Sequence, residues 1–180
     1  LKGNPHFSDP DAKAEGYLIN CQTRTMTYEL RRRGFPVEAL PNKNDEFYKV
    51  WCPKNNLTWN DRFLNPDGSR PIKTRPSVLR DTITAKVGFI EGATKETGRY
   101  ELYLKWKSVR GRDGGAHVMI VERQKDGNLL WFDPQSGKHG SSKTFNGFMK
   151  SAVPVKLSVL RIDDKIINPK FSERFKKASK

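Results

Sequence analysis

Long apolar runs, cysteines and histidines are all scarce in this 180-residue sequence. The longest uninterrupted apolar run lies near Val118–Val121, far below the ~20 apolar residues of a membrane-spanning helix, so we expect no membrane span. The N-terminal residues are polar, which predicts no secretory signal there. Two Cys cannot build a disulfide framework, and with three His they show no paired metal-ligand spacing. We therefore expect no metal and no other cofactor.

Negative charge is also in short supply. The chain has 34 Lys and Arg against 20 Asp and Glu, a formal net charge of +14. Such an excess indicates an acidic partner, which is a nucleic acid, an anionic membrane surface or an acidic protein. Dense basic clusters are few, and the charge alone does not select among these partners. The chain does not start with Met, so we expect it to be part of a longer protein.

The first half of the sequence predicts one well-marked helix over residues 21–33. Its apolar residues recur at helical spacing, Asn20 is suited to cap its free amides, and Gly34 is a natural stop. Residues 42–97 are predicted to form an irregular insertion plus a second helix, which begins at Ser77 and runs to Val87.

The second half is typical of an antiparallel sheet. In the strand from Tyr100 to Trp106, Tyr100, Leu102, Leu104 and Trp106 share one face, which we expect to pack under the helix 21–33. Further strands are predicted at 116–122, 129–133 and 155–162. A helix followed by consecutive strands gives an α+β fold, with one domain over residues 1–170 and a frayed basic tail over 171–180.

Three residues suggest nucleophilic chemistry. Cys21 opens the predicted helix, where backbone amides stabilise a thiolate. His117 lies on a strand after a Gly-Gly loop and can act as a base, and Asp133 ends the next strand and can orient that base. Taken singly, a Cys is more often a buried apolar residue and a strand His more often structural. Together they predict a catalytic triad, with Gln135 as a candidate donor to an oxyanion.

A catalytic triad requires a particular length for the connection between the strand with His117 and the strand with Asp133. Residues directly opposite each other in an antiparallel hairpin share a face. A two-residue turn at Asp126-Gly127 would put His117 and Asp133 on opposite faces. A triad therefore predicts a five-residue loop, such as 123–127, or a bulge.

The sequence resembles the papain-fold toxin family of glutamine deamidases. The resemblance rests on Asn20-Cys21-Gln22, the stretch from Tyr28 to Pro41, Gly115-Ala116-His117-Val118 and Phe132-Asp133-Pro134-Gln135, and it spans roughly Asn4 to Asp163. These elements in this order are more specific than any one of them. In one departure, Arg24 stands three residues after Cys21, where the family often has a second Cys; we interpret that difference as one of packing.

The resemblance implies a papain-like fold and a role for each triad residue. Cys21 is the nucleophile, His117 the general base and Asp133 its orienter, while Gln22, Gln135 and Asn20 are candidates for contacts with the oxyanion or the substrate. It further implies a bacterial toxin or effector domain that is secreted or delivered within a larger protein and acts in the cytoplasm of a target cell. Its partners would be a protein substrate carrying a reactive glutamine and a cognate immunity protein.

Other functions remain open at this point. The same triad would serve a cysteine protease or a transglutaminase, because only the substrate cleft separates these activities. The charge of +14 suggests a nucleic-acid-binding protein or a nuclease, which we rank lower because no nucleic-acid-reading motif is present. An inactive interaction module of the same fold is a further alternative. Spacing does not decide whether Cys21 and Cys52 pair, and the target protein and producing organism stay unidentified.

Overall fold

The computed structural model describes residues 8–11, 13, 16–42, 49–50 and 52–177. Its contacts divide the chain into two compact units. Unit 1 comprises the chain up to Pro71, Pro134–Gly137 and the segment from Asp164 onward, whereas unit 2 comprises Ile72–Asp133 and Lys138–Asp163. The chain is 31% helical and 26% strand, in agreement with the predicted α+β class. The single domain over residues 1–170 stays a prediction.

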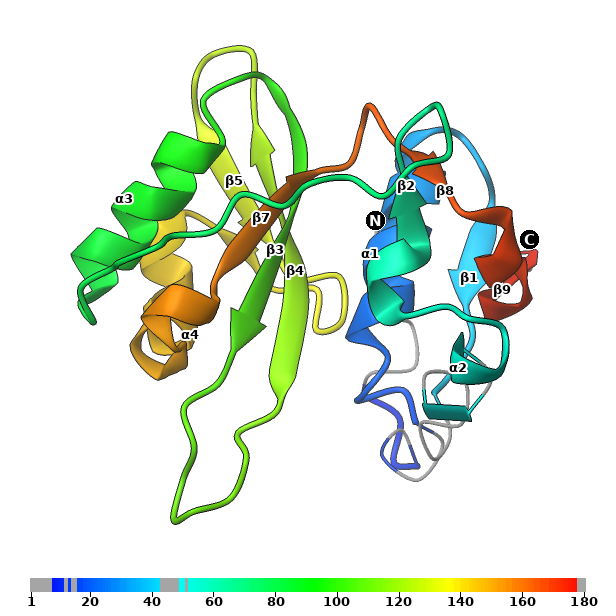
Figure 1. Cartoon of the computed structure of the whole chain (residues 1–180), viewed down its shortest axis with the longest axis horizontal. Helices are drawn as coiled ribbons and strands as arrows, with labels where there is room; N and C mark the ends of the chain where they lie inside the picture. The colour runs from blue at the N-terminus through cyan, green and yellow to red at the C-terminus, as the bar shows by residue number, and fades with distance from the viewer. Residues whose placement is uncertain (1–7, 12, 14–15, 43–48, 51, 178–180) are drawn as a thin grey trace. The chain divides into compact units, whose positions relative to one another are not determined.

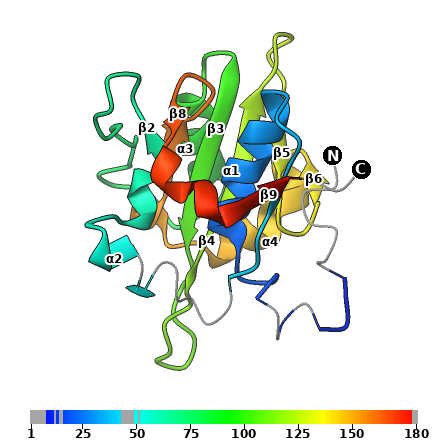
Figure 2. The same ribbon diagram turned by 90° about the vertical axis from the view of Figure 1, so that its right-hand side faces the viewer.

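Unit 2 is built on a five-stranded antiparallel sheet in the order β6-β5-β4-β3-β7 (Figure 1). The long strands β3 and β4 lie side by side at its centre (Figure 2). As the sequence predicts, β3, β4 and β5 are consecutive neighbours. The sequence does not predict β6, and the last predicted strand, β7, pairs with β3 and not with β5. The bounds are β3 Gly98–Lys105, β4 Ala116–Arg123, β5 Leu129–Phe132, β6 His139–Gly140 and β7 Ser158–Arg161.

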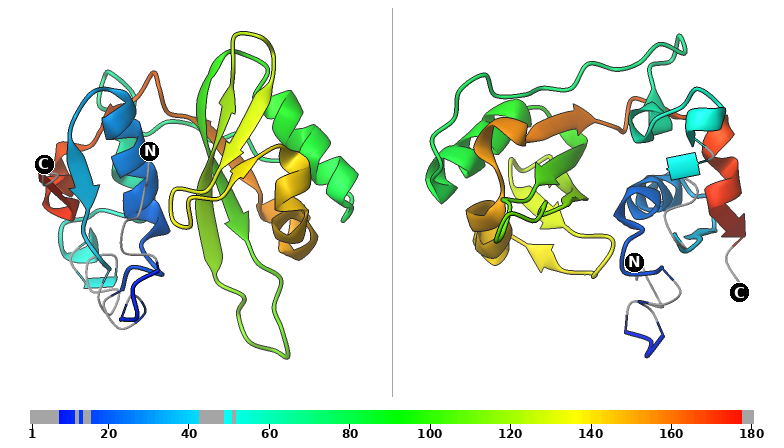
Figure 3. Two further views of the ribbon diagram at one scale, coloured as in Figure 1. Left: turned by 180° about the vertical axis from the view of Figure 1, so that it is seen from behind. Right: turned by 60° about the horizontal axis from the view of Figure 1, so that its bottom comes forward.

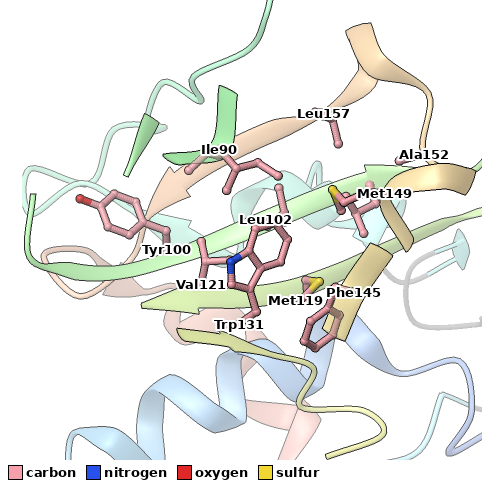
Figure 4. Packing of buried hydrophobic residues seen from close by; sticks show 12 residues of the cluster. Ile90, Tyr100, Leu102, Met119, Val121, Trp131, Phe145, Met149, Ala152 and Leu157 are labelled. Carbon is pink, nitrogen blue, oxygen red and sulfur yellow. The ribbon is translucent and has the colours of Figure 1, made fainter. Parts of the chain in front are cut away.

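The core of unit 2 lies on one face of this sheet. The alternation predicted for β3 is confirmed, because Tyr100, Leu102 and Leu104 all belong to the buried cluster. Two helices of unit 2, α3 (Ile83–Ala93) and α4 (Asn146–Ser151), cover this face (Figure 3, left). Strand residues therefore meet Ile90 of α3 and Met149 of α4 (Figure 4).

The prediction that the helix 21–33 packs on this face is wrong. The cluster contains neither Tyr28 nor Leu30 of that helix. The reason is visible in composition: α3 presents Ile83, Val87 and Ile90 at helical spacing, whereas the early helix carries mostly polar residues. Apolar stripes cover apolar sheet faces because burying both removes the most apolar surface from water.

The second helix starts later than predicted. It begins at Ile83 rather than Ser77, because the side chain of Thr82 accepts a hydrogen bond from the amide of Ala85 at 3.1 Å and caps the helix there. It also continues to Ala93, so the turn expected from Gly92 starts only at Thr94. Lys86 of this helix is fully buried, and its ammonium donates to the carbonyls of Met149 (2.7 Å) and Ala152 (2.6 Å) at the end of α4.

Unit 1 contains the helix predicted over 21–33, here α1 (Cys21–Arg32). Gly34, with φ +91°, ends it as expected: its amide donates to Arg31, and that of Phe35 donates to Leu30. The predicted role of Asn20 as a side-chain cap is wrong, because its side chain makes no capping hydrogen bond. Its carboxamide nitrogen donates instead to the carbonyl of Leu40 at 3.2 Å.

Short strand pairs complete unit 1. Strand β1 (Val37–Ala39) pairs with β9 (Phe175–Lys177), and β2 (Phe63–Leu64) pairs with β8 (Ile166–Ile167). The frayed tail expected from residue 171 is therefore corrected: Phe171 is fully buried and 175–177 form a strand, while 178–180 lie outside the described residues. Within the insertion, α2 spans Cys52–Lys54, and residues 43–48 and 51 lie outside the described residues. Among described residues, no helix is long and apolar enough to cross a membrane.

Candidate active site

The hairpin of β4 and β5 places His117 and Asp133 on one face of the sheet. Its register pairs Arg123 with Leu129 and Ile120 with Phe132, so residues 124–128 form the connection. The predicted loop of five residues is thereby confirmed, one position later than the example given above. In this register Asp133 lies opposite Met119, two residues from His117 along β4 and on the same face.

A hydrogen bond joins the two side chains. His117 Nε2 lies 3.0 Å from Asp133 Oδ1, and the side chains are only 12% and 4% exposed. With Asp133 ionised, its carboxylate accepts the Nε2 proton, which leaves the lone pair on Nδ1. The backbone also holds Asp133, whose amide donates to the carbonyl of Lys138 at 2.8 Å. This pair is therefore an oriented base.

Aromatic rings enclose the imidazole. The ring of Trp106 stacks on that of His117 at 6.1 Å between centroids and 17° between planes. Phe148 of α4 meets His117 edge-on at 5.7 Å and also meets Trp106 at 5.4 Å. These contacts restrict the ring to one orientation and reduce the water around its bond to Asp133.

Little in the sequence indicates this enclosure. Trp106 was predicted only as a core residue. Its proximity to His117 follows from the pairing of Leu104 with His117, a register that the strand pattern alone does not provide. Phe148 lies on a six-residue helix far away in the sequence, and no local signal relates it to His117.

Cys21, the third residue of the predicted triad, belongs to unit 1. It is the first residue of α1, half-buried and not in a disulfide. Cys52 is also a free thiol, so the two cysteines are not paired. Cys52 is fully buried, and desolvation, assisted by the negative charge of Asp61, raises its pKa to about 11.

The surroundings of Cys21 contain two buried guanidinium groups. Arg24 is 1% exposed and lies over the ring of Tyr17 at 5.8 Å. Burial lowers its pKa to about 10, so it stays charged at neutral pH. Arg62, equally buried, donates to the carbonyl of Gln22 at 2.8 Å. Two positive charges thus lie at the helix end that carries Cys21.

The three candidates for oxyanion contacts have different surroundings. The side chain of Asn20 is engaged with Leu40, as described above, and the carboxamide of Gln135 donates to the carbonyl of Leu18. The side-chain carbonyl oxygen of Gln22 is buried and has no hydrogen-bond partner among the described residues. We find no cluster of three or more potential metal-ligating side chains in the described part of the chain.

Comparisons with known proteins find no relative of this chain. No protein-family model, no curated protein and no solved structure matches this chain. The geometry of the His117–Asp133 pair, together with Cys21 at the start of α1, is therefore the structural feature that bears on function.

Alkylation should distinguish the two cysteines. At pH 8 only about one Cys52 thiol in a thousand is ionised, because its pKa is about 11. We expect iodoacetamide to modify the half-buried Cys21 at least about ten-fold faster than Cys52, measured by peptide mass spectrometry. A Cys21→Ala variant should lose the fast phase and keep the slow one, and both thiols should react alike in denaturant. Equal rates in the folded protein would contradict the prediction.

Proposed function

We propose that this chain is a cysteine-dependent hydrolase that converts glutamine side chains of a target protein to glutamate. The observation that carries the proposal is the hydrogen bond of 3.0 Å between His117 Nε2 and the buried carboxylate of Asp133. A histidine oriented in this way can take a proton from a thiol and return it to a leaving group. The proposal adds the thiol of Cys21, which would meet the Nδ1 side of the ring during catalysis.

The first half of the reaction forms a thioester. His117 Nδ1 takes the thiol proton, and the thiolate of Cys21 attacks the carboxamide carbon of the substrate glutamine. The developing oxyanion is held by backbone amides at the start of α1, with the side chain of Gln22 as a further candidate donor after rotation of its carboxamide. The imidazolium then gives its proton to the leaving nitrogen, the C–N bond breaks and ammonia departs.

The second half regenerates the enzyme. A water molecule loses a proton to His117 as its oxygen attacks the thioester carbon. The tetrahedral intermediate collapses, the C–S bond breaks, and the product is a glutamate side chain. Cys21 leaves as a thiolate and regains its proton from His117. Asp133 stabilises the positively charged imidazole in both halves.

The biological setting follows from the resemblance to papain-fold toxins. We propose a papain-like fold and a toxin or effector domain that belongs to a larger bacterial protein and acts in the cytoplasm of the target cell. A cognate immunity protein would protect the producing cell. The excess of 14 positive charges fits a substrate with an acidic surface.

The test is chemical analysis of glutamine-containing proteins after incubation with the purified chain. Release of ammonia with an uncut substrate and a Gln-to-Glu mass change supports deamidation. Cleavage of the substrate would indicate a protease, and incorporation of an added primary amine a transglutaminase. Release of ammonia at the wild-type rate by the Cys21→Ala variant would overturn the thiol mechanism.

A further inference from the structure

The connection between β3 and β4 ends in a tight, exposed tip. The amide of Val109 donates to the carbonyl of Arg112 at 3.1 Å, and the amide of Arg112 donates back at 3.0 Å. Arg110 and Gly111, between them, have φ values of +50° and +74°. Two positive values are what a type I′ turn requires. The long loop that carries this tip is seen projecting beyond the sheet in Figure 1.

Arg110 is an unusual choice for its position. The first central residue of such a turn is normally Asn, Asp or Gly, and a long side chain at positive φ is strained. Packing does not account for the arginine, because its side chain is exposed and has no hydrogen bond or ion pair with the described residues. A strained residue with a free charged side chain suggests a role in binding.

Positive charge on this loop is concentrated at its tip. Lower down, Lys105 pairs with Asp113, and Lys107 pairs with Asp81 at 2.8 Å. Arg112, like Arg110, is exposed and has no acidic partner among the described residues. The tip thus presents two guanidinium groups without an acidic partner in the described part of the chain.

An exposed apolar residue accompanies these charges. Val109, next to Arg110 and opposite Arg112, is 67% exposed. The tip therefore combines charge with an apolar contact, which is the composition of a protein-binding surface and not of a purely electrostatic one.

The base of the loop packs against the ring that stacks on the histidine. The carboxylate of Asp113 accepts from the amide of Gly115 at 2.8 Å. Gly114 packs so closely on Trp106 that a Cβ atom there would lie 2.7 Å from the Cβ of Trp106. Trp106 in turn stacks on His117. The base of the loop that carries the tip is therefore connected to His117 through Trp106.

We propose that this tip, Val109 to Arg112, docks an acidic segment of the protein substrate; this inference rests on the proposed function. Two guanidinium groups can each form charge-assisted hydrogen bonds with carboxylates, and Val109 can cover an apolar side chain between them. A nucleic acid is a poorer fit, because two cations displace few counterions and give weak affinity, with a salt slope of only about −2.

Binding is measured with the Cys21→Ala protein and a fluorescent peptide that carries a glutamine flanked by Glu and Leu. The tip variant is Arg110→Asn with Arg112→Gln, because Asn adopts positive φ readily and keeps the turn. The control, Lys125→Gln with Lys150→Gln, removes the same charge from exposed positions elsewhere on unit 2. We expect Kd to rise about ten-fold in the tip variant and less than about two-fold in the control.

Further measurements distinguish a failure of the docking proposal from a failure of the proposed function. In the active protein, the tip variant should raise KM for this peptide and leave kcat unchanged. Loss of peptide binding to the same extent in tip and control variants would overturn the docking proposal, even if deamidation is confirmed. Tip-dependent binding without any deamidation would support docking and overturn the function. If binding of a random DNA duplex depends on the tip while peptide binding does not, the ligand of the tip is nucleic-acid phosphate and the acidic segment is overturned.

Discussion

Cys21→Ala and His117→Ala should each remove nearly all glutamine deamidation, a loss on the order of 10⁴-fold or more in kcat. Without the thiol no thioester forms, and without the imidazole neither the thiol nor the leaving nitrogen exchanges its proton. The double variant should be little worse than either single one, because residues of one catalytic unit act together. Ammonia release and growth arrest of cells expressing the domain provide the two readouts.

Substitutions of Asp133 should have smaller effects on activity than those of Cys21 and His117. Asp133→Ala should retain more activity than the other two variants, since this residue only orients the imidazole and stabilises its charge. Asp133→Asn keeps an oxygen for the Nε2 proton and should retain more than Asp133→Ala. All variants should keep the wild-type circular dichroism spectrum. Intact ammonia release and growth arrest in His117→Ala would show that the papain-like assignment is wrong.

Lys86→Met should lower the free energy of unfolding by about 3–5 kcal/mol. Met keeps the apolar stem of the side chain, so packing is preserved. The loss comes from the two carbonyls of Met149 and Ala152, which would be buried without a donor at the end of α4. Such a loss is a large fraction of the stability of an ordinary domain. Chemical denaturation, read as a shift in the midpoint, measures it.

Lys107→Met is the matched control for this prediction. Lys107 and Lys86 pair with opposite oxygens of the same carboxylate, Asp81, but the side chain of Lys107 is 44% exposed and that of Lys86 only 1%. An exposed ion pair contributes little, so the control should unfold at nearly the wild-type midpoint. Equal losses in the two variants would mean that the ion pair with Asp81, and not the bonds to α4, is what matters.

The parts of the fold that sequence predicted well are those governed by local rules. The helix end at Gly34 and the alternation along β3 need only capping chemistry and a period of two. A five-residue loop, given as 123–127 and observed at 124–128, was predicted from the requirement that His117 and Asp133 share a face. The helix that covers the core face was predicted wrongly, because the choice of partner depends on which apolar stripes the topology brings together.

In the candidate site, too, the sequence predicts the residues that local patterns identify and misses those that tertiary packing brings in. Cys21, His117 and Asp133 were found from residue type, order and resemblance, and the structure joins the last two directly. The contacts of Trp106 and Phe148 with the imidazole depend on strand register and on a distant short helix, so no local pattern identifies them. The side-chain cap expected of Asn20 failed because the carboxamide found a tertiary partner, Leu40.

The pairing of β1 with β9 and of β2 with β8 has a consequence for how the chain matures during translation. Unit 2 is nearly continuous in sequence and can fold while the ribosome is still adding residues. Unit 1, which carries Cys21, lacks two of its strands until the segment from Asp164 onward has emerged. A nascent chain therefore completes the unit with the oriented histidine first, and its thiol-bearing unit becomes complete only after the segment that follows directly, through β9, has emerged. If the chain is a toxin, the producing cell gains an interval in which synthesis has begun but the nucleophile is not yet in its final surroundings.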